Sequence, residues 1–233
     1  MKKIITIFIV LTFSLTACAG FLGSKNIAEN TDTPNKDYDT VNGSITVGSN
    51  SHVGDLSTVN GSVKVYSNSV IGEASTVNGS IIFSEGVKAE SAETVNGSIK
   101  LATGCKIEKD VETVNGSITA ASECDIGGDY ETVNGKLKAI NTKIHGNIKT
   151  VNGSIILLDG TTAYEDIIIR KSKGFFNKSK KKKPVVVLGK NVTVKGELIF
   201  ERPVTLYIHS TADVDDDIEN AEIERFSGNE SPY

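Results

Sequence analysis

The chain has 233 residues, of which 38% are hydrophobic and 23% charged, with 22 glycines, no tryptophan and a formal net charge of −4 at pH 7. This apolar content is too high for a disordered chain, and the slightly acidic balance argues against a nucleic-acid-binding protein. Past the first 17 residues no stretch is apolar enough to cross a membrane as a helix. The length suits one elongated domain or two small ones.

The first 17 residues have the features of an export signal. Lys2 and Lys3 precede a short apolar run from Ile4 to Leu15, a pattern typical of a secretory signal peptide over residues 1–17. The run ends in Leu15-Thr16-Ala17-Cys18, which resembles the lipobox of bacterial lipoproteins. The alternative is an ordinary signal peptide followed by a cysteine by chance.

The lipobox resemblance implies that Cys18 is lipidated and becomes the first residue of the mature protein. Its acyl chains would anchor the protein stably to a membrane of the cell envelope, because more than one chain is present. Where lipoproteins are sorted by the residue after the cysteine, Ala19 favours the outer membrane, facing the periplasm or the surface. Residues 18–39 are polar and lack apolar periodicity, so they predict a flexible tether.

An internal repeat dominates the rest of the sequence. The phrase Thr-Val-Asn-Gly recurs at spacings of 18 or 19 residues. Its copies begin at Thr40, Thr58, Thr76, Thr94, Thr113, Thr132 and Thr150. A β-hairpin meander would need a second regular turn in each repeat, which the sequence lacks. The period instead predicts an all-β fold, a single parallel β-solenoid with about 18 residues and three short strands per coil over residues 40–169.

The repeated phrase predicts one corner of each coil. Glycine is expected there because it adopts positive φ, and asparagine because it tolerates the left-handed region. Stacking would place the asparagines in a hydrogen-bonded ladder. Its members are Asn42, Asn60, Asn78, Asn96, Asn115, Asn134 and Asn152. Val41 and Ile45 are expected to point inward on either side of the corner.

The repeat is interrupted by a basic segment, residues 170–184, which carries eight positive charges and no negative one. Strand patterns resume over residues 185–212, so the segment is predicted to be a loop, and an acidic segment, residues 213–233, follows. The loop is a solvated insertion, a contact for anionic lipid or lipopolysaccharide, or a partner for the acidic segment of its own or another chain. The candidate contact residues are Arg170, Lys171, Lys173, Phe175, Phe176, Lys178, Lys180, Lys181, Lys182 and Lys183.

Cys105 and Cys124 occupy the same place in consecutive coils. Stacking would bring them within the range of a disulfide, and the alternative is two buried free thiols. His52, His145 and His209 fall at unrelated repeat positions. A hexapeptide-repeat acyltransferase has similar coils and a histidine base, but it needs an intracellular acyl donor.

The remaining patterns favour a protein that is not an enzyme. Asp215-Asp216-Asp217 lacks the spaced ligands and turn glycine of a calcium loop. The outward positions of the repeat, mostly Ser, Thr, Lys and Glu, are expected to lack matched placement. We therefore expect no metal site and no cofactor.

The Thr-Val-Asn-Gly-Ser-Ile phrase at this spacing resembles the repeats of bactofilin-like polymer-forming proteins and of adhesin-type bacterial β-solenoids, over roughly residues 40–210. The resemblance implies a scaffold or an adhesin-like surface or, alternatively, a polymer that assembles end to end at a membrane. The lipobox, the basic insertion and the acidic end depart from the bactofilin pattern.

Overall fold

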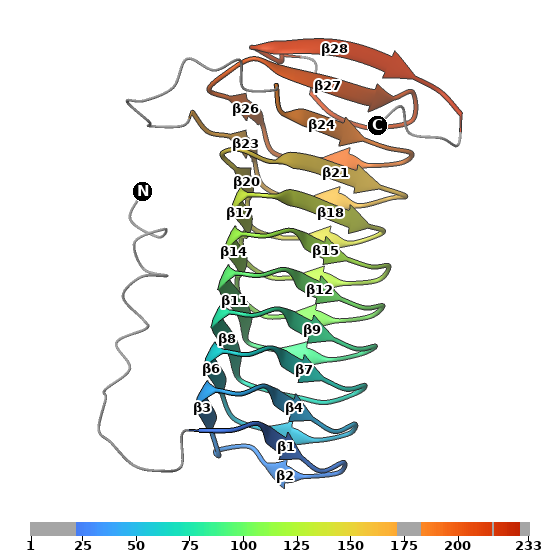
Figure 1. Ribbon diagram of the computed structural model, residues 1–233. Helices are drawn as coiled ribbons and strands as arrows, with labels where there is room; N and C mark the ends of the chain where they lie inside the picture. Colours follow the sequence, from blue (N-terminus) through green and yellow to red (C-terminus); the bar gives the residue numbers. More distant parts are fainter. Residues whose placement is uncertain (1–21, 172–182, 216, 229–233) are drawn as a thin grey trace, which may run out of the picture.

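The computed structural model describes residues 22–171, 183–215 and 217–228. These residues are all-β and form a single rod of stacked coils with three faces (Figure 1). The prediction of a parallel β-solenoid is therefore confirmed. No helix is present among the described residues, and so none that could cross a membrane.

Three parallel sheets run along the rod, one on each face. The eleven-stranded sheet comprises, in spatial order, β1 (Lys25–Ile27), β4 (Ile45–Val47), β7 (Val63–Val65), β9 (Ile81–Phe83), β12 (Ile99–Leu101), β15 (Ile118–Ala120), β18 (Lys136–Ile140), β21 (Ser154–Leu158), β24 (Val185–Leu188), β27 (Val204–His209) and β28 (Ala221–Phe226). The nine-stranded sheet comprises β3 (Tyr38–Asn42), β6 (Leu56–Asn60), β8 (Glu73–Asn78), β11 (Ser91–Asn96), β14 (Val111–Asn115), β17 (Tyr130–Asn134), β20 (Ile148–Thr150), β23 (Ile167–Ile169) and β26 (Leu198–Phe200).

The third face is built from strands of only two residues. Its six-stranded part comprises β10 (Lys88–Ala89), β13 (Lys106–Ile107), β16 (Asp125–Ile126), β19 (Lys143–Ile144), β22 (Thr162–Ala163) and β25 (Thr193–Val194). A separate pair, β2 (Asp32–Thr33) and β5 (His52–Val53), is linked to it by isolated bridges through Val70. At about 4.8 Å per strand, the eleven-stranded sheet makes the rod roughly 48 Å long.

The coils stack in register, so each residue lies over its own repeat position. Thr58 pairs with Thr76, and Asn60 with Asn78. From Asn60 onward, each asparagine of the repeated phrase donates a hydrogen bond from Nδ2 to Oδ1 of the asparagine one coil earlier, at 2.9–3.0 Å. The predicted asparagine ladder therefore runs without a gap from Asn42 to Asn152.

The glycine of the corner is needed for a reason other than the predicted one. None of the Asn-Gly glycines has positive φ. A Cβ on Gly97 would instead lie 1.8 Å from the carbonyl oxygen of Gly79, so glycine is required because successive corners approach closely. Left-handed residues occur at the next corner along the coil, for example at Asn68 and Gly104.

The strand before the corner also faces the other way from the prediction. Val41 and Val59 are half-buried on the outer surface, whereas Thr40 and Thr58 are fully buried. Inward threonine is stable because its hydroxyl is satisfied: Thr58 Oγ1 donates to the carbonyl oxygen of Gly43 at 2.8 Å. The same bond recurs in the neighbouring coils.

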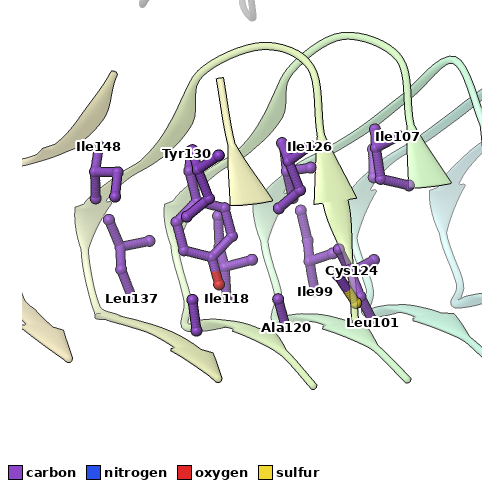
Figure 2. Packing of buried hydrophobic residues seen from close by; sticks show 14 of the residues in the cluster. Ile99, Leu101, Ile107, Ile118, Ala120, Cys124, Ile126, Tyr130, Leu137 and Ile148 are labelled. Atoms are coloured by element: carbon purple, nitrogen blue, oxygen red, sulfur yellow. The ribbon is translucent and has the colours of Figure 1, made fainter. Parts of the chain in front are cut away.

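The rod is filled by rows of aliphatic side chains. Figure 2 shows one row from Ile99 through Ile118 to Leu137, all fully buried. Tyr130 is the largest fully buried side chain, and its hydroxyl donates to the carbonyl oxygen of Lys138 at 2.8 Å. The interior also contains small buried residues, such as Ala120 (Figure 2), which take up less of the space that the Tyr130 ring needs.

The solenoid is longer at both ends than the predicted boundaries. Residues 22–39, predicted as part of a tether, belong to the first coil, in which β1 pairs with β4 and β2 with β5. Leu22 bridges to Asn42, so Leu22-Gly23-Ser24 stands where later coils have Asn-Gly-Ser. At the other end, the acidic segment contributes β28, which extends the sheet beyond β27.

Gly97 and Gly104 are glycines for different reasons: the backbone of the neighbouring coil approaches Gly97 closely, whereas Gly104 has positive φ. We expect Gly97→Ala to destabilise the protein by more than about 3 kcal/mol, because its Cβ would meet backbone that has no room to move. Gly104→Ala has space around the Cβ but φ of +72°, and we expect it to cost only about 1–2 kcal/mol. Urea denaturation of both variants measures the difference, and equal losses would contradict this account.

Candidate functional site

The basic segment leaves the rod at the asparagine corner. Thr150 pairs with Ile169, and Ile155 pairs with Val186. The residues between Ile169 and Val186 therefore replace the short Val-Asn-Gly-Ser corner that follows Thr150. The strands on both sides stay in register, so the coil that carries the insertion is intact, and β23 and β24 lie near the C-terminal end of the rod (Figure 1).

Of the ten predicted contact residues, the structure describes Arg170, Lys171 and Lys183. Lys171 and Lys183 are exposed and Arg170 is half-buried. The Lys171 backbone amide donates to Glu201 Oε2 at 2.8 Å, and Lys183 forms an ion pair with Glu222 of β28. The seven others lie outside the described residues, as does Cys18. They are Lys173, Phe175, Phe176, Lys178, Lys180, Lys181 and Lys182.

Arg202 belongs to the same corner, which the sequence did not reveal. Its Nη2 donates to the carbonyl oxygen of Val151, and Nε is buried without a partner. Burial lowers the pKa of the Arg202 guanidinium. The residue lies 31 positions after Lys171, and only the pairing of β23 with β26 brings the two segments together. The ion pair and Arg202 tie the insertion's base to the last coils.

The two cysteines are buried free thiols, so the structure contains no disulfide between Cys105 and Cys124. Each thiol donates to a different carbonyl oxygen, that of Ser84 at 3.3 Å and that of Ala102 at 3.2 Å. Ser69 makes the equivalent bond to Gly48. The cysteines therefore take the place of small hydroxyl residues in an inward column. A hydrogen bond with Cys124 and burial raise the pKa of the Cys105 thiol.

The three histidines do not converge on one site. His52 lies 3.6 Å from Asp32, and His145 stacks on Tyr164 with ring centroids 4.5 Å apart. His209 lines a hollow of about 320 Å³ beside Phe226. Both of its ring nitrogens are engaged, Nδ1 with Thr211 and Nε2 with the carbonyl oxygen of Gly228. This histidine therefore fastens the chain after β28 to the rod.

Carboxylates do gather on the outer surface of the nine-stranded sheet, contrary to the expectation of unmatched outward positions. Glu93 pairs with Glu112, and Glu112 with Glu131, in consecutive strands. The next residue in this column is Lys149. Like charges placed directly opposite one another on parallel strands destabilise a sheet unless something compensates them.

A second acidic column runs beside the first. Asp110 Oδ1 accepts a hydrogen bond from the Asp129 backbone amide at 2.7 Å, and Asp129 Oδ1 accepts one from the Asn147 amide at 2.9 Å. Asp129 also forms an ion pair with Lys149. One ligand oxygen each of Asp110, Glu112 and Asp129 lies within 4.8 Å of the other two. We call these three residues the carboxylate cluster. The cluster was not apparent from the sequence because its members come from two successive coils.

The surroundings shift the acidities of these groups in opposite directions. Burial, reinforced by Glu131 and Asp110, raises the pKa of Glu112 to about 8. Burial and Glu73 raise the pKa of Glu93 to about 7. Burial also acts to raise the pKa of Asp129, but hydrogen bonds from Lys149 and Asn147 outweigh it and lower the pKa. Lys149 thus compensates Asp129 more than it does Glu112.

Comparison with protein-family models, with curated proteins and with solved structures finds no match to this chain. The fold therefore defines the class by itself: the chain is a β-solenoid repeat protein with a rigid, rod-shaped scaffold. The resemblance to bactofilin-like and adhesin-type families rests on the repeated phrase alone.

The raised pKa of Glu112 predicts a pH-dependent stability. Between its unfolded value near 4.5 and its folded value of about 8, the folded state keeps a proton that the unfolded state has lost. Stability is therefore lost as pH rises through this window. Glu112→Gln, which carries no charge at any pH, should match the wild type near pH 5 and exceed it near pH 9 by on the order of 4 kcal/mol.

Thermal unfolding in the presence of a chelator measures this difference. Glu108→Gln is the matched control, because Glu108 is exposed in the same coil and outside the carboxylate cluster. Its pH profile should follow that of the wild type. A constant difference between Glu112→Gln and the wild type across the pH range would contradict the assignment.

Proposed function

We propose that this protein is a non-enzymatic bacterial lipoprotein of the cell envelope, anchored through Cys18, whose β-solenoid serves as a scaffold or adhesin-like surface. The single observation that supports it best is the separation of two predicted contact points along one rigid rod. The predicted anchor, Cys18, is close in sequence to the first coil. The corner that bears the basic segment, residues 170–184, lies near the last coils, and we call it the basic corner.

The separation of the predicted anchor from the basic corner follows from two lengths, one along the chain and one along the rod. Cys18 lies four residues before Leu22, a span of at most about 14 Å in an extended chain. The insertion joins the rod at β24, eight strands along the sheet from β1, or about 40 Å at the usual strand spacing. A rod standing on its anchor would hold the basic corner away from its own membrane, toward an opposing anionic surface. A rod lying down would bring the corner to its own membrane.

The contacts of the cysteines and of His209 support a structural role over a catalytic one. Both thiols are buried and donate to carbonyl oxygens, and both ring nitrogens of His209 are engaged. The proposal includes no cofactor. Anionic lipid or lipopolysaccharide phosphate is the proposed partner of the basic corner, because clustered Lys and Arg bind such surfaces.

The alternative proposal is a bactofilin-like polymer of the cell envelope. One observation favours it: among the described residues, β1 and β28 are the end strands of the eleven-stranded sheet and each pairs on one side only. An unpaired strand edge is a template for another chain. However, β28 carries Glu222, Glu224 and Arg225 along this edge, and charged side chains oppose such pairing. Filaments that grow with concentration would favour the polymer over the tethered rod.

The anchor is tested by cell fractionation. We expect the wild type in the membrane fraction, released only by detergent, with an N-terminal peptide that carries acyl chains by mass spectrometry. Cys18→Ser should be released as a soluble protein, because a single exported chain without lipid lacks stable anchoring. Equal membrane association of the two proteins would overturn the lipoprotein proposal.

The basic corner is tested by co-sedimentation of the soluble Cys18→Ser protein with vesicles of phosphatidylglycerol and phosphatidylcholine. Binding should weaken with salt and be lost when Lys180, Lys181, Lys182 and Lys183 are replaced by serine, a loss of about 4 kcal/mol. The matched control replaces the exposed Lys88, Lys100, Lys106 and Lys143, which changes the net charge equally. If both variants lose binding alike, the effect is one of net charge and the corner is not the contact.

A further inference from the structure

The carboxylate cluster has the dimensions of a cation site. Two oxygens bound to one calcium ion at 2.3–2.6 Å cannot lie farther apart than about 5 Å. One oxygen each of Asp110, Glu112 and Asp129 meets this condition for every pair, since all lie within 4.8 Å of one another. The cluster therefore offers three hard oxygen ligands around a common point, a donor set that suits calcium or magnesium.

Two of the three carboxylates are held in place by the next coil. The Asp129 backbone amide donates to Asp110 Oδ1, and the Asn147 backbone amide and Nδ2 both donate to Asp129 Oδ1. Each carboxylate offers about four acceptor positions on its two oxygens, so these bonds orient the groups and leave further acceptor positions. Such outer contacts commonly fix metal ligands.

Glu112 provides the independent indication of a ligand. The residue is only 6% exposed, and no described residue donates a hydrogen bond to its carboxylate. Its neighbours in the same column are Glu93 and Glu131, which are acidic as well. A carboxylate with so little exposure gains only limited stabilisation from water, and a cation held at the cluster would compensate its charge. Its oxygen nevertheless lies with those of Asp110 and Asp129.

We propose that Asp110, Glu112 and Asp129 bind one divalent cation of the calcium class on the outer surface of β14 and β17. The Lys149 ammonium already pairs with Asp129, and with all three carboxylates ionised these four groups carry a formal charge of −2. Calcium suits the cluster better than magnesium because it accepts irregular geometry, with water filling the remaining positions. Glu131 stands beside the cluster as a further carboxylate.

The test measures calcium binding to the purified Cys18→Ser full-length protein, treated with chelator and then titrated with calcium chloride at moderate salt and pH 8. We expect one calcium per chain by calorimetry, with a Kd on the order of 10⁻⁴–10⁻³ M, and a saturable rise in melting temperature. Magnesium chloride should bind more weakly. No saturable binding by the wild type would overturn the proposal.

Variants locate the site. Glu112→Gln keeps the shape of the side chain and should fold, but we expect its calcium affinity to fall by about tenfold or more because a charged ligand is lost. Glu108→Gln removes an exposed charge from the same coil and should bind as the wild type does. Calcium affinity unchanged in Glu112→Gln, or lowered equally in both variants, would overturn the assignment of the site.

Discussion

The structure depends on in-register stacking of one coil on the next. At a strand spacing of about 4.8 Å, every side chain on the rod meets the same repeat position of the coil above and of the coil below. A residue type is therefore tolerated at a repeat position only if its side chain can pack against, or hydrogen-bond to, an identical side chain in the next coil or a fixed backbone group nearby. This condition acts on the repeat more strongly than any strand propensity does.

The columns meet this condition in different ways. Asparagine complements itself, because its amide is both donor and acceptor, and the ladder from Asn42 to Asn152 uses both functions. Inward threonine and cysteine instead donate to carbonyl oxygens of the coils beneath. The glutamate column cannot complement itself while it is ionised. Lys149 relieves one end of it, and burial, together with the charges of Glu131 and Asp110, raises the pKa of Glu112.

The period of the repeat was sufficient to predict the fold class, the coil length and the asparagine ladder, because these follow from spacing alone. The inward side of the Thr-Val-Asn strand was predicted wrongly, since hydrophobicity favoured Val41 over Thr40 and took no account of the Gly23 carbonyl that Thr40 reaches. The first coil was missed because Leu22-Gly23-Ser24 lacks the asparagine that marks the later corners.

The candidate sites were predictable to different degrees. The basic segment is visible as a run of charges, but Arg202 joins it only through strand pairing. Asp110 and Glu112 are ordinary surface residues in sequence, and their proximity to Asp129 depends on which outward columns lie side by side. That arrangement requires the register of each coil, including the 19-residue repeats around β14 and β17, which the spacing of the repeated phrase alone does not give.

The insertion at an asparagine corner leaves the strands on both sides paired, as Ile155 with Val186 shows. A corner can therefore carry a long peptide without altering the coils that support it. The height of such a peptide above the first coil is determined by the coil that bears it, in steps of about 4.8 Å. The solenoid thus sets the height of an inserted peptide in equal steps. Moving the same peptide to the corner of an earlier coil would lower that height by a fixed number of steps, with no change in the peptide itself.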